Sequence, residues 1–106
     1  MGRLTFGEGL RVDAEDRDIA HVHRVMLAKL RRGEGLHFSW RDDMSIGDGR
    51  TTVWVHPDAP LVCKLTRQVG SFNHKWLDEL AVAANSNEGL TFLPEADEHP
   101  RPKGRS

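Results

Sequence analysis

The spacing of the apolar residues changes along the chain, and this change constrains the fold more than any other feature. Over residues 14–32 the apolar side chains recur at helical spacing and form one stripe, made of Ile19, Val22, Met26 and Leu30. Acidic residues in the first turns and basic residues in the last turns favour the same helix through its dipole. On both sides of this stretch, apolar and polar residues alternate, which is the period of a half-buried strand. A chain that switches between the two periods is expected to form an α+β fold.

The alternating segments predict a β-hairpin followed by a three-stranded meander. The hairpin occupies the first dozen residues, with its turn at residues 7–9. The meander comprises residues 36–41, 51–56 and 61–66, separated by loops rich in Asp, Gly and Pro. Asp13, together with Asp16, is expected to cap the helix that follows the hairpin.

A second helix is expected from Asn73, as N-cap, to Asn87, and a short strand over residues 90–93 before Pro94. The predicted order is ββ-α-βββ-α-β, an antiparallel sheet with both helices packed on one face. Residues 1–94 are expected to form a single domain. Residues 95–106 are charged and contain proline, so they are expected to form a disordered tail.

Length, charge and cysteine content limit the function classes. The 106 residues fit one small domain, and a formal charge of −1 provides no general attraction to nucleic acid or to acidic membranes. Cys63 is the only cysteine and cannot form an internal disulfide, which is typical of a reducing cytoplasm. No apolar run is long enough for a membrane span, so we expect a cytoplasmic protein.

Several short motifs occur together in this chain. They include Leu4-Thr5-Phe6, Asp16-Arg17, Phe38-Ser39-Trp40, Gly47-Asp48-Gly49-Arg50, Trp54-x-His56-Pro57 and Ala84-Asn85-Ser86. With these motifs the sequence resembles a family of short actinobacterial proteins of about 100 residues. The resemblance runs from the N-terminus to about Pro94. It implies an uncharacterised function, although members of the family often carry the label "ATP-dependent DNA ligase".

Ligase catalysis needs a lysine nucleophile in a Lys-x-Asp-Gly motif to form the covalent adenylate. Here Asp48 and Gly49 are present, but Ile46 occupies the position of the lysine. An aliphatic side chain cannot attack a phosphate, so we expect no ligase activity in this chain. Residues 47–50 are then expected to form a tight turn.

The outer face of the predicted meander is the first candidate for a binding surface. If Leu36, Phe38 and Trp40 face the core, alternation sends their neighbours into solvent. The candidate residues on this face are Trp54, His56, His37, Arg41 and Lys64. An exposed Trp among cationic side chains is typical of a platform for bases or of a protein contact. The alternative is that Trp54 lies under the hairpin or the tail, or at a homodimer contact.

The second candidate is a basic stripe on the first helix. Arg17, Arg24 and Arg31 are seven residues apart and share one side, with His21 and Arg32 beside them. Such a stripe suits phosphates or an acidic partner. It is equally the pattern of a solvated helix face.

A third group combines carboxylates with histidine. Asp42, Asp43 and Asp48, with His56 nearby, have the chemistry for a divalent metal or a small enzyme site. Their spacing matches no dedicated metal motif and is typical of turns, and the sequence contains no nucleophile triad, CxxC pair or phosphate-binding loop. We therefore expect no catalytic residue, no metal and no cofactor.

Together these observations predict a small cytoplasmic binding module without catalysis. Its partner is expected to be a protein, a second copy of the chain, or a nucleic acid. Two alternatives stay open. One is a DNA-associated accessory protein, and the other is a small enzyme around Asp42, Asp43, Asp48 and His56.

Overall fold

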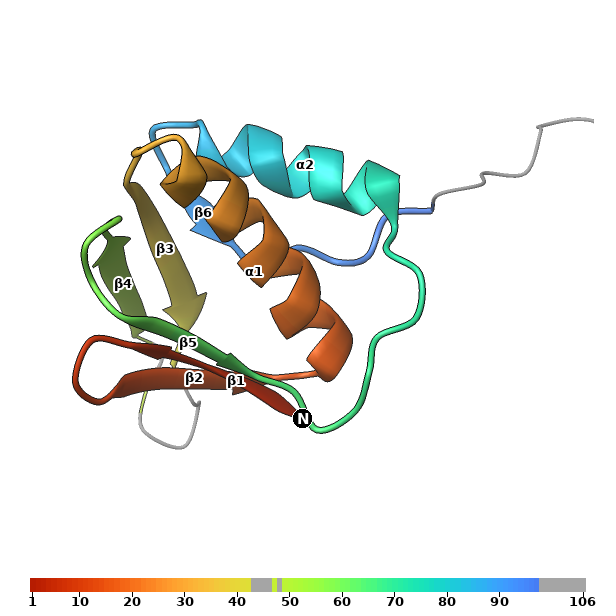
Figure 1. Ribbon diagram of the computed structural model, residues 1–106, viewed down its shortest axis with the longest axis horizontal. Coiled ribbons are helices and arrows are strands. Elements are labelled where there is room, and N and C mark those ends of the chain that lie inside the picture. Colours follow the sequence, from red (N-terminus) through yellow and green to blue (C-terminus); the bar gives the residue numbers. More distant parts are fainter. Residues whose placement is uncertain (43–46, 48, 98–106) are drawn as a thin grey trace, which may run out of the picture.

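The computed structural model describes residues 1–42, 47 and 49–97. Within these residues, six strands and two helices follow one another in the predicted order ββ-α-βββ-α-β (Figure 1). They are β1 (Gly2–Phe6), β2 (Leu10–Ala14), α1 (Asp16–Arg31), β3 (Leu36–Arg41), β4 (Arg50–Val55), β5 (Leu61–Lys64), α2 (His74–Ala84) and β6 (Leu90–Thr91). The α+β class is confirmed.

The strands form two sheets, where the sequence predicted one. One sheet has the order β2-β1-β5 and is antiparallel throughout, whereas the other has the order β4-β3-β6, with β6 parallel to β3. The predicted meander is therefore wrong at its last strand, because β5 pairs with β1 and not with β4. The chain after β4 turns towards the hairpin, where the Gly7 amide donates to the Pro60 carbonyl at 3.0 Å.

The core lies between the inner faces of the two sheets and the helices. The ring of Phe6, from β1, lies 5.9 Å from the rings of both Phe38 and Trp40, from β3. Helix α1 packs against β1, and α2 packs against α1 and β6 (Figure 1). The expected arrangement, with both helices on one face of a single sheet, is not observed, because the two sheets each form one side of the core.

The start of α1 differs from the prediction. The helix begins at Asp16, and Glu15 stands at the N-cap position without a side-chain hydrogen bond to the helix. Asp13 belongs to β2 and forms an ion pair with Arg3 at 2.6 Å, while the Asp16 carboxylate accepts from the Thr66 amide and hydroxyl. Both carboxylates are thus engaged by neighbouring chain segments. At the other end, Gly33 adopts a φ of 76°, which suits the end of a helix.

The N-cap of α2 is confirmed. The Asn73 side-chain oxygen accepts from the Trp76 amide at 3.0 Å. The same side chain donates to the Ala96 carbonyl, so Glu95 and Ala96, which we expected in a disordered tail, contact the domain. Residues 98–106, the rest of the predicted tail, lie outside the described residues. In the described ranges no helix combines the length and the apolar character that a membrane crossing needs.

Candidate interaction surface

Trp54 lies on the outer face of the β4-β3-β6 sheet and is 53% exposed. His37 stands opposite it in the β3–β4 ladder, and the two rings meet edge-on with their centroids 4.7 Å apart. Their sequence neighbours Phe38 and Val55 are buried in the core, as the alternation predicted. The indole therefore lies in solvent and is not covered by the hairpin.

The indole of Trp54 packs against the backbone of Gly35. A Cβ atom at this position would come within 2.6 Å of Cζ2 of Trp54 and within 3.0 Å of the Val55 carbonyl oxygen. Because no side chain intervenes, the indole packs directly on the backbone at the start of β3. The Trp54 ring is thus held between Gly35 and His37 before any partner arrives.

An apolar hollow adjoins Trp54 where the two sheets meet. Its volume is about 160 Å³, and its lining includes Phe6, Leu10, Val53 and Pro60. Leu10 is itself 43% exposed, at the tip of the β1–β2 hairpin. The indole and the hollow together form an apolar surface that spans both sheets.

Two arginines occupy the other end of the same outer face. Arg50 Nη2 donates to the Ser39 hydroxyl at 2.9 Å and to the Thr91 hydroxyl at 3.3 Å. Arg41 faces Arg50 in the ladder and is exposed. Four residues of extended chain separate this pair from Trp54 and His37, which is about 13 Å. Basic and aromatic groups therefore occupy separate ends of the face.

The two remaining residues predicted for this face are placed differently. His56 follows β4 and is exposed, but its Nδ1 accepts from the Asp58 amide at 3.0 Å, so the ring helps to form a turn. Lys64 lies in β5, opposite Arg3, in the other sheet. The structure thus brings together Trp54 and His37, leaves His56 beside them, and removes Lys64 from the group.

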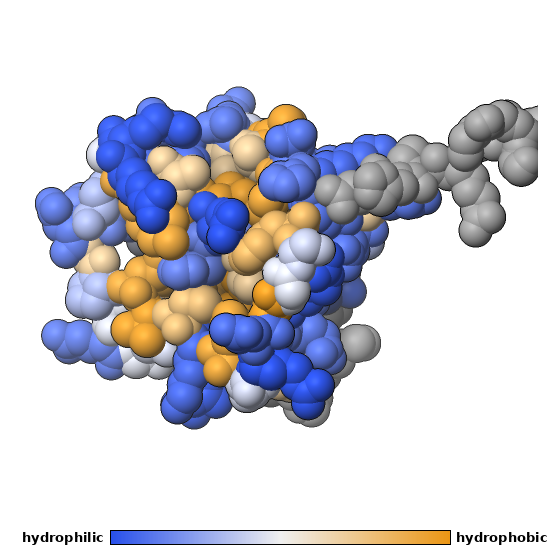
Figure 2. Space-filling model, turned by 45° about the vertical axis from the view of Figure 1, so that its right-hand side comes forward, coloured by the Kyte–Doolittle hydropathy of each residue, from blue (hydrophilic) through white to orange (hydrophobic). Residues whose placement is uncertain are grey.

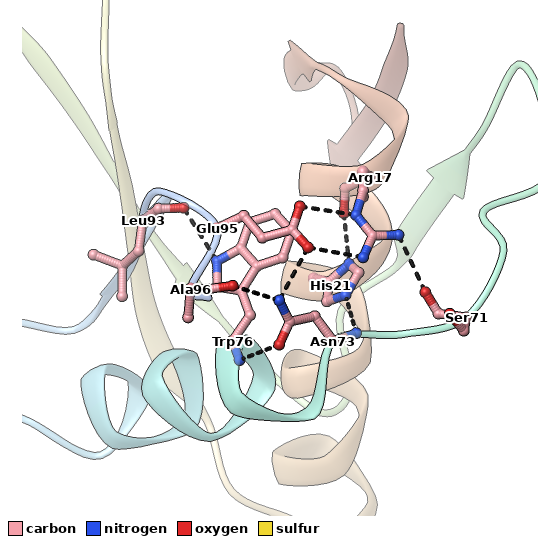
Figure 3. A network of polar contacts seen from close by, with 8 residues as sticks. All are labelled: Arg17, His21, Ser71, Asn73, Trp76, Leu93, Glu95 and Ala96. Atoms are coloured by element: carbon pink, nitrogen blue, oxygen red, sulfur yellow. Dashed lines mark hydrogen bonds and ion pairs between the residues drawn. The ribbon is translucent and has the colours of Figure 1, made fainter. Parts of the chain in front are cut away.

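The basic stripe of α1 is largely engaged in contacts within the domain. Arg17 donates both to the Glu95 carboxylate, at 2.8 and 2.9 Å, and to the Ser71 carbonyl at 3.1 Å (Figure 3). The Arg24 guanidinium lies 3.7 Å above the centre of the Phe72 ring. The Glu95 carboxylate accepts hydrogen bonds from the Arg17 guanidinium and from the Asn73 side-chain amide, and these bonds lower the pKa of Glu95 to about 2. Arg24 and Arg31 are exposed, whereas Arg17 is half-buried.

His21, which the sequence placed beside this stripe, is fully buried. Its Nδ1 lies 2.8 Å from the Arg17 carbonyl, and its Nε2 accepts from the Asn73 amide at 2.9 Å (Figure 3). The ring stacks on Trp76, with the centroids 4.3 Å apart. Burial lowers the pKa of His21. Helical periodicity does not indicate this role, because α1 is covered on two sides and its apolar stripe marks only one of them.

Within the described residues, the two members of the third candidate group, Asp42 and His56, do not lie close together. Asp42 accepts from the Thr51 hydroxyl at 2.6 Å, at the start of β4, whereas His56 follows the end of that strand, about 17 Å away. Asp43 and Asp48 lie outside the described residues, as does part of the predicted turn at residues 47–50. Over the described ranges, no cluster of three or more His, Cys, Asp or Glu is suited to a metal ion.

A second hollow lies between the two helices. Figure 2 shows apolar residues in the middle of the face that carries α1 and α2, with hydrophilic residues around them. This groove has a volume of about 310 Å³. Its apolar lining includes Val25, Ala28, Leu77 and Ala81, and Arg24, Lys29 and Arg32 stand along its α1 side.

Comparison with known proteins places the chain in one family. The model of the domain of unknown function DUF7882 matches residues 1–95. The chain belongs to this family. The match ends at Glu95, the residue that joins the C-terminal segment to α1. No curated protein and no solved structure matches the chain.

Proposed function

We propose that this DUF7882 domain is a binding module without catalytic activity that recognises a protein partner. Its contact surface is the Trp54 surface, which we define as Trp54, His37 and the adjoining hollow lined by Phe6, Leu10 and Pro60. The observation that carries the proposal is the half-exposed indole, held in position by Gly35 and His37 beside an apolar hollow.

The energetics of the indole support this proposal. A Trp side chain offers 150–250 Å² of contact area, so an indole that is 53% exposed leaves roughly 100 Å² for a partner. Burial of this area is worth about 2–3 kcal/mol. Because Gly35 and His37 already restrict the ring, little conformational entropy is lost on binding. A Trp fixed in this way has the properties of an interface hot spot.

Charge favours a protein over a nucleic acid as the partner. The chain carries a formal charge of −1, and Arg41 and Arg50 stand at the far end of the face from Trp54. Arg17 and Arg24, which the sequence suggested for phosphate contacts, bind Glu95 and Phe72. Nucleic-acid affinity comes mainly from basic side chains that neutralise phosphates, and the arginines considered for this role lie away from the indole.

The setting that we infer for this function is the cytoplasm of an actinobacterium. The single cysteine supports a reducing compartment, and burial raises the pKa of its thiol, as expected of a packing residue. The resemblance to short actinobacterial proteins supports the source. A DNA-associated role, which the ligase label of those proteins suggests, is the second candidate, and the paired Arg41 and Arg50 are the groups that would serve it.

Selection from a phage-displayed library of random peptides tests the proposed function. The wild-type domain is the target, Trp54→Ala is the counter-target, and the binding of selected peptides is measured by fluorescence anisotropy. We expect peptides whose affinity falls at least about tenfold in Trp54→Ala, which is the loss of a hot spot. Short oligothymidine and oligouridine, measured in the same way, are expected to show no Trp54-dependent binding.

The control is Val82→Ala, which removes an exposed apolar side chain from α2, away from the Trp54 surface. This variant should bind the peptides like the wild type. Both variants should keep the native fold, since neither side chain is part of the core. Val82→Ala should unfold within about 0.5 kcal/mol of the wild type, and Trp54→Ala should be less stable by at most about 2–3 kcal/mol, because it loses the buried half of the indole. Peptides that bind Trp54→Ala unchanged, or a library that yields no binder, would contradict the proposal.

A further inference from the structure

The edges of the two sheets are protected to different degrees. Strand β2 carries Arg11 and Asp13, β5 is four residues long and ends with Lys64, and β6 has two residues. Strand β4 has six residues in unbroken register with β3, and it contains no charge or proline after Arg50. Charges, prolines and short lengths are the usual means of preventing further strand pairing at an edge. Strand β4 lacks these features over most of its length.

The ladder shows which backbone groups of β4 point outward. The Asp42 amide donates to the Gly49 carbonyl, its direct partner, at 2.9 Å. Because hydrogen-bonded and non-hydrogen-bonded pairs alternate in an antiparallel ladder, the N–H and C=O groups of Arg50, Thr52 and Trp54 face away from β3. Within the described part of the chain, no hydrogen bond satisfies these outward groups.

The outward residues are arranged symmetrically about Thr52. If a second β4 strand runs antiparallel with Thr52 opposite the partner copy's Thr52, Arg50 stands opposite the partner copy's Trp54, and Trp54 opposite its Arg50. Each of these pairs exchanges two hydrogen bonds, so every outward group is satisfied. On the outer surface, the Arg50 side chain, whose guanidinium bonds to Ser39 and Thr91, then has an indole as its cross-strand neighbour and not a second arginine.

We propose that the partner at this edge is a second copy of the chain, which joins β4 to β4 in a two-fold antiparallel pairing. The two β4-β3-β6 sheets then become one continuous sheet of six strands, with Trp54 of each copy beside Arg50 of the other. The inference rests on the proposed function, because it names the partner of the Trp54 surface. Two-fold pairing of identical surfaces is the commonest form of protein assembly.

The test is sedimentation velocity over a range of concentrations on the full chain and three variants. The wild type should pass from a monomer of 12.0 kDa to twice that mass as its concentration rises. Thr52→Pro removes an outward N–H without removing a ladder bond to β3, and proline is tolerated at such edge positions. It should weaken the dimer at least about tenfold, since it removes hydrogen bonds at the centre of the pairing.

Thr52→Val is the matched control, because it keeps the N–H and the β-branched shape, so it should dimerise like the wild type. Circular dichroism of Thr52→Pro should show the native fold. Trp54→Ala should also weaken the dimer, since it removes the contact with Arg50 of the other copy.

A wild type that stays monomeric at every concentration, or a Thr52→Pro variant that folds and dimerises normally, would overturn this inference. If the wild type is monomeric but Trp54-dependent peptides are still selected, the partner is a different chain, and the inference fails while the proposed function stands. If no Trp54-dependent peptide is found and the dimer forms but is unaffected by Trp54→Ala, the β4 edges pair without the Trp54 surface, so the proposed function fails together with the Trp54–Arg50 neighbourhood of the inference.

Discussion

At the scale of single residues, His21 joins the two helices through its two ring nitrogens. One nitrogen bonds to a carbonyl of α1 and the other accepts the backbone amide that precedes α2. This arrangement requires a neutral ring with its proton on Nδ1, because a proton on Nε2 would face the Asn73 N–H. Protonation of His21 therefore opposes the packing of α1 against α2.

Because of His21, the free energy of unfolding is predicted to depend on pH. Burial lowers the pKa of His21 in the folded protein below its ordinary value of 6.5. As the pH falls through 6.5, the unfolded chain takes up a proton that the folded protein does not. The contribution of neutral His21 to the free energy of unfolding is therefore complete above pH 6.5. It decreases below that pH, by at most about 1.4 kcal/mol per pH unit for one histidine. Urea unfolding between about pH 7 and pH 5 measures this slope.

The variant His21→Asn separates His21 from His23, whose pKa burial also lowers. His21→Asn is expected to be less stable at every pH, because it loses the stacking on Trp76, but its stability should depend less on pH. Equal slopes in the variant and the wild type would show that His21 is not the group responsible.

The sequence could predict which side chains alternate, but not every environment that they enter. Trp54 and Phe38 lie where the period of two placed them, because a strand has only two faces. His21 is buried because α2 and the residue 65–73 segment cover a second side of α1. That coverage depends on contacts between residues far apart in the chain, which helical periodicity does not encode.

At the scale of elements, Asn73 determines where α2 begins and holds the C-terminal segment. Its side-chain oxygen caps the helix, and its amide group donates to Glu95 and to the Ala96 carbonyl. Asn73→Ala should lower the free energy of unfolding by at least about 2 kcal/mol, the sum of a lost cap and of buried bonds. Chemical denaturation at neutral pH measures the change.

Asn85→Ala is the control for this prediction. Asn85 is exposed at the other end of α2 and accepts a hydrogen bond from Lys29. Its replacement should change stability by about 0.5 kcal/mol or less, as is usual for surface sites. Similar losses in the two variants would indicate that Asn73 acts only through the propensity of the helix.

Strand β5 shows why the elements were predicted better than their pairing. Its alternation, with Leu61 and Cys63 turned inward, is equally compatible with pairing to β4 or to β1. The residues between β4 and β5 carry the chain to the hairpin, where Pro60 bonds to Gly7. Lys64 points into solvent as predicted but belongs to the other sheet, since the exposed face and the pairing partner of a strand are set by different interactions.

At the scale of the whole molecule, two small sheets share one core and leave different surfaces outside. Helix α1 covers the β2-β1-β5 sheet, while the outer face of the β4-β3-β6 sheet carries Trp54. The open edge of β4 carries Trp54, the residue at the centre of the Trp54 surface. One partner can therefore use backbone pairing and indole burial together.

Residue-resolved hydrogen exchange of the β4 amides tests this central claim most directly. In dilute protein the outward amides of Thr52 and Trp54 should exchange fast, and those of Thr51 and Val53, which bond to β3, should exchange slowly. At high concentration, or with a selected peptide, the amides of Thr52 and Trp54 should become protected while those of Thr51 and Val53 change little. If Thr52 and Trp54 exchange equally fast under all these conditions, the edge of β4 engages no partner and the account is contradicted.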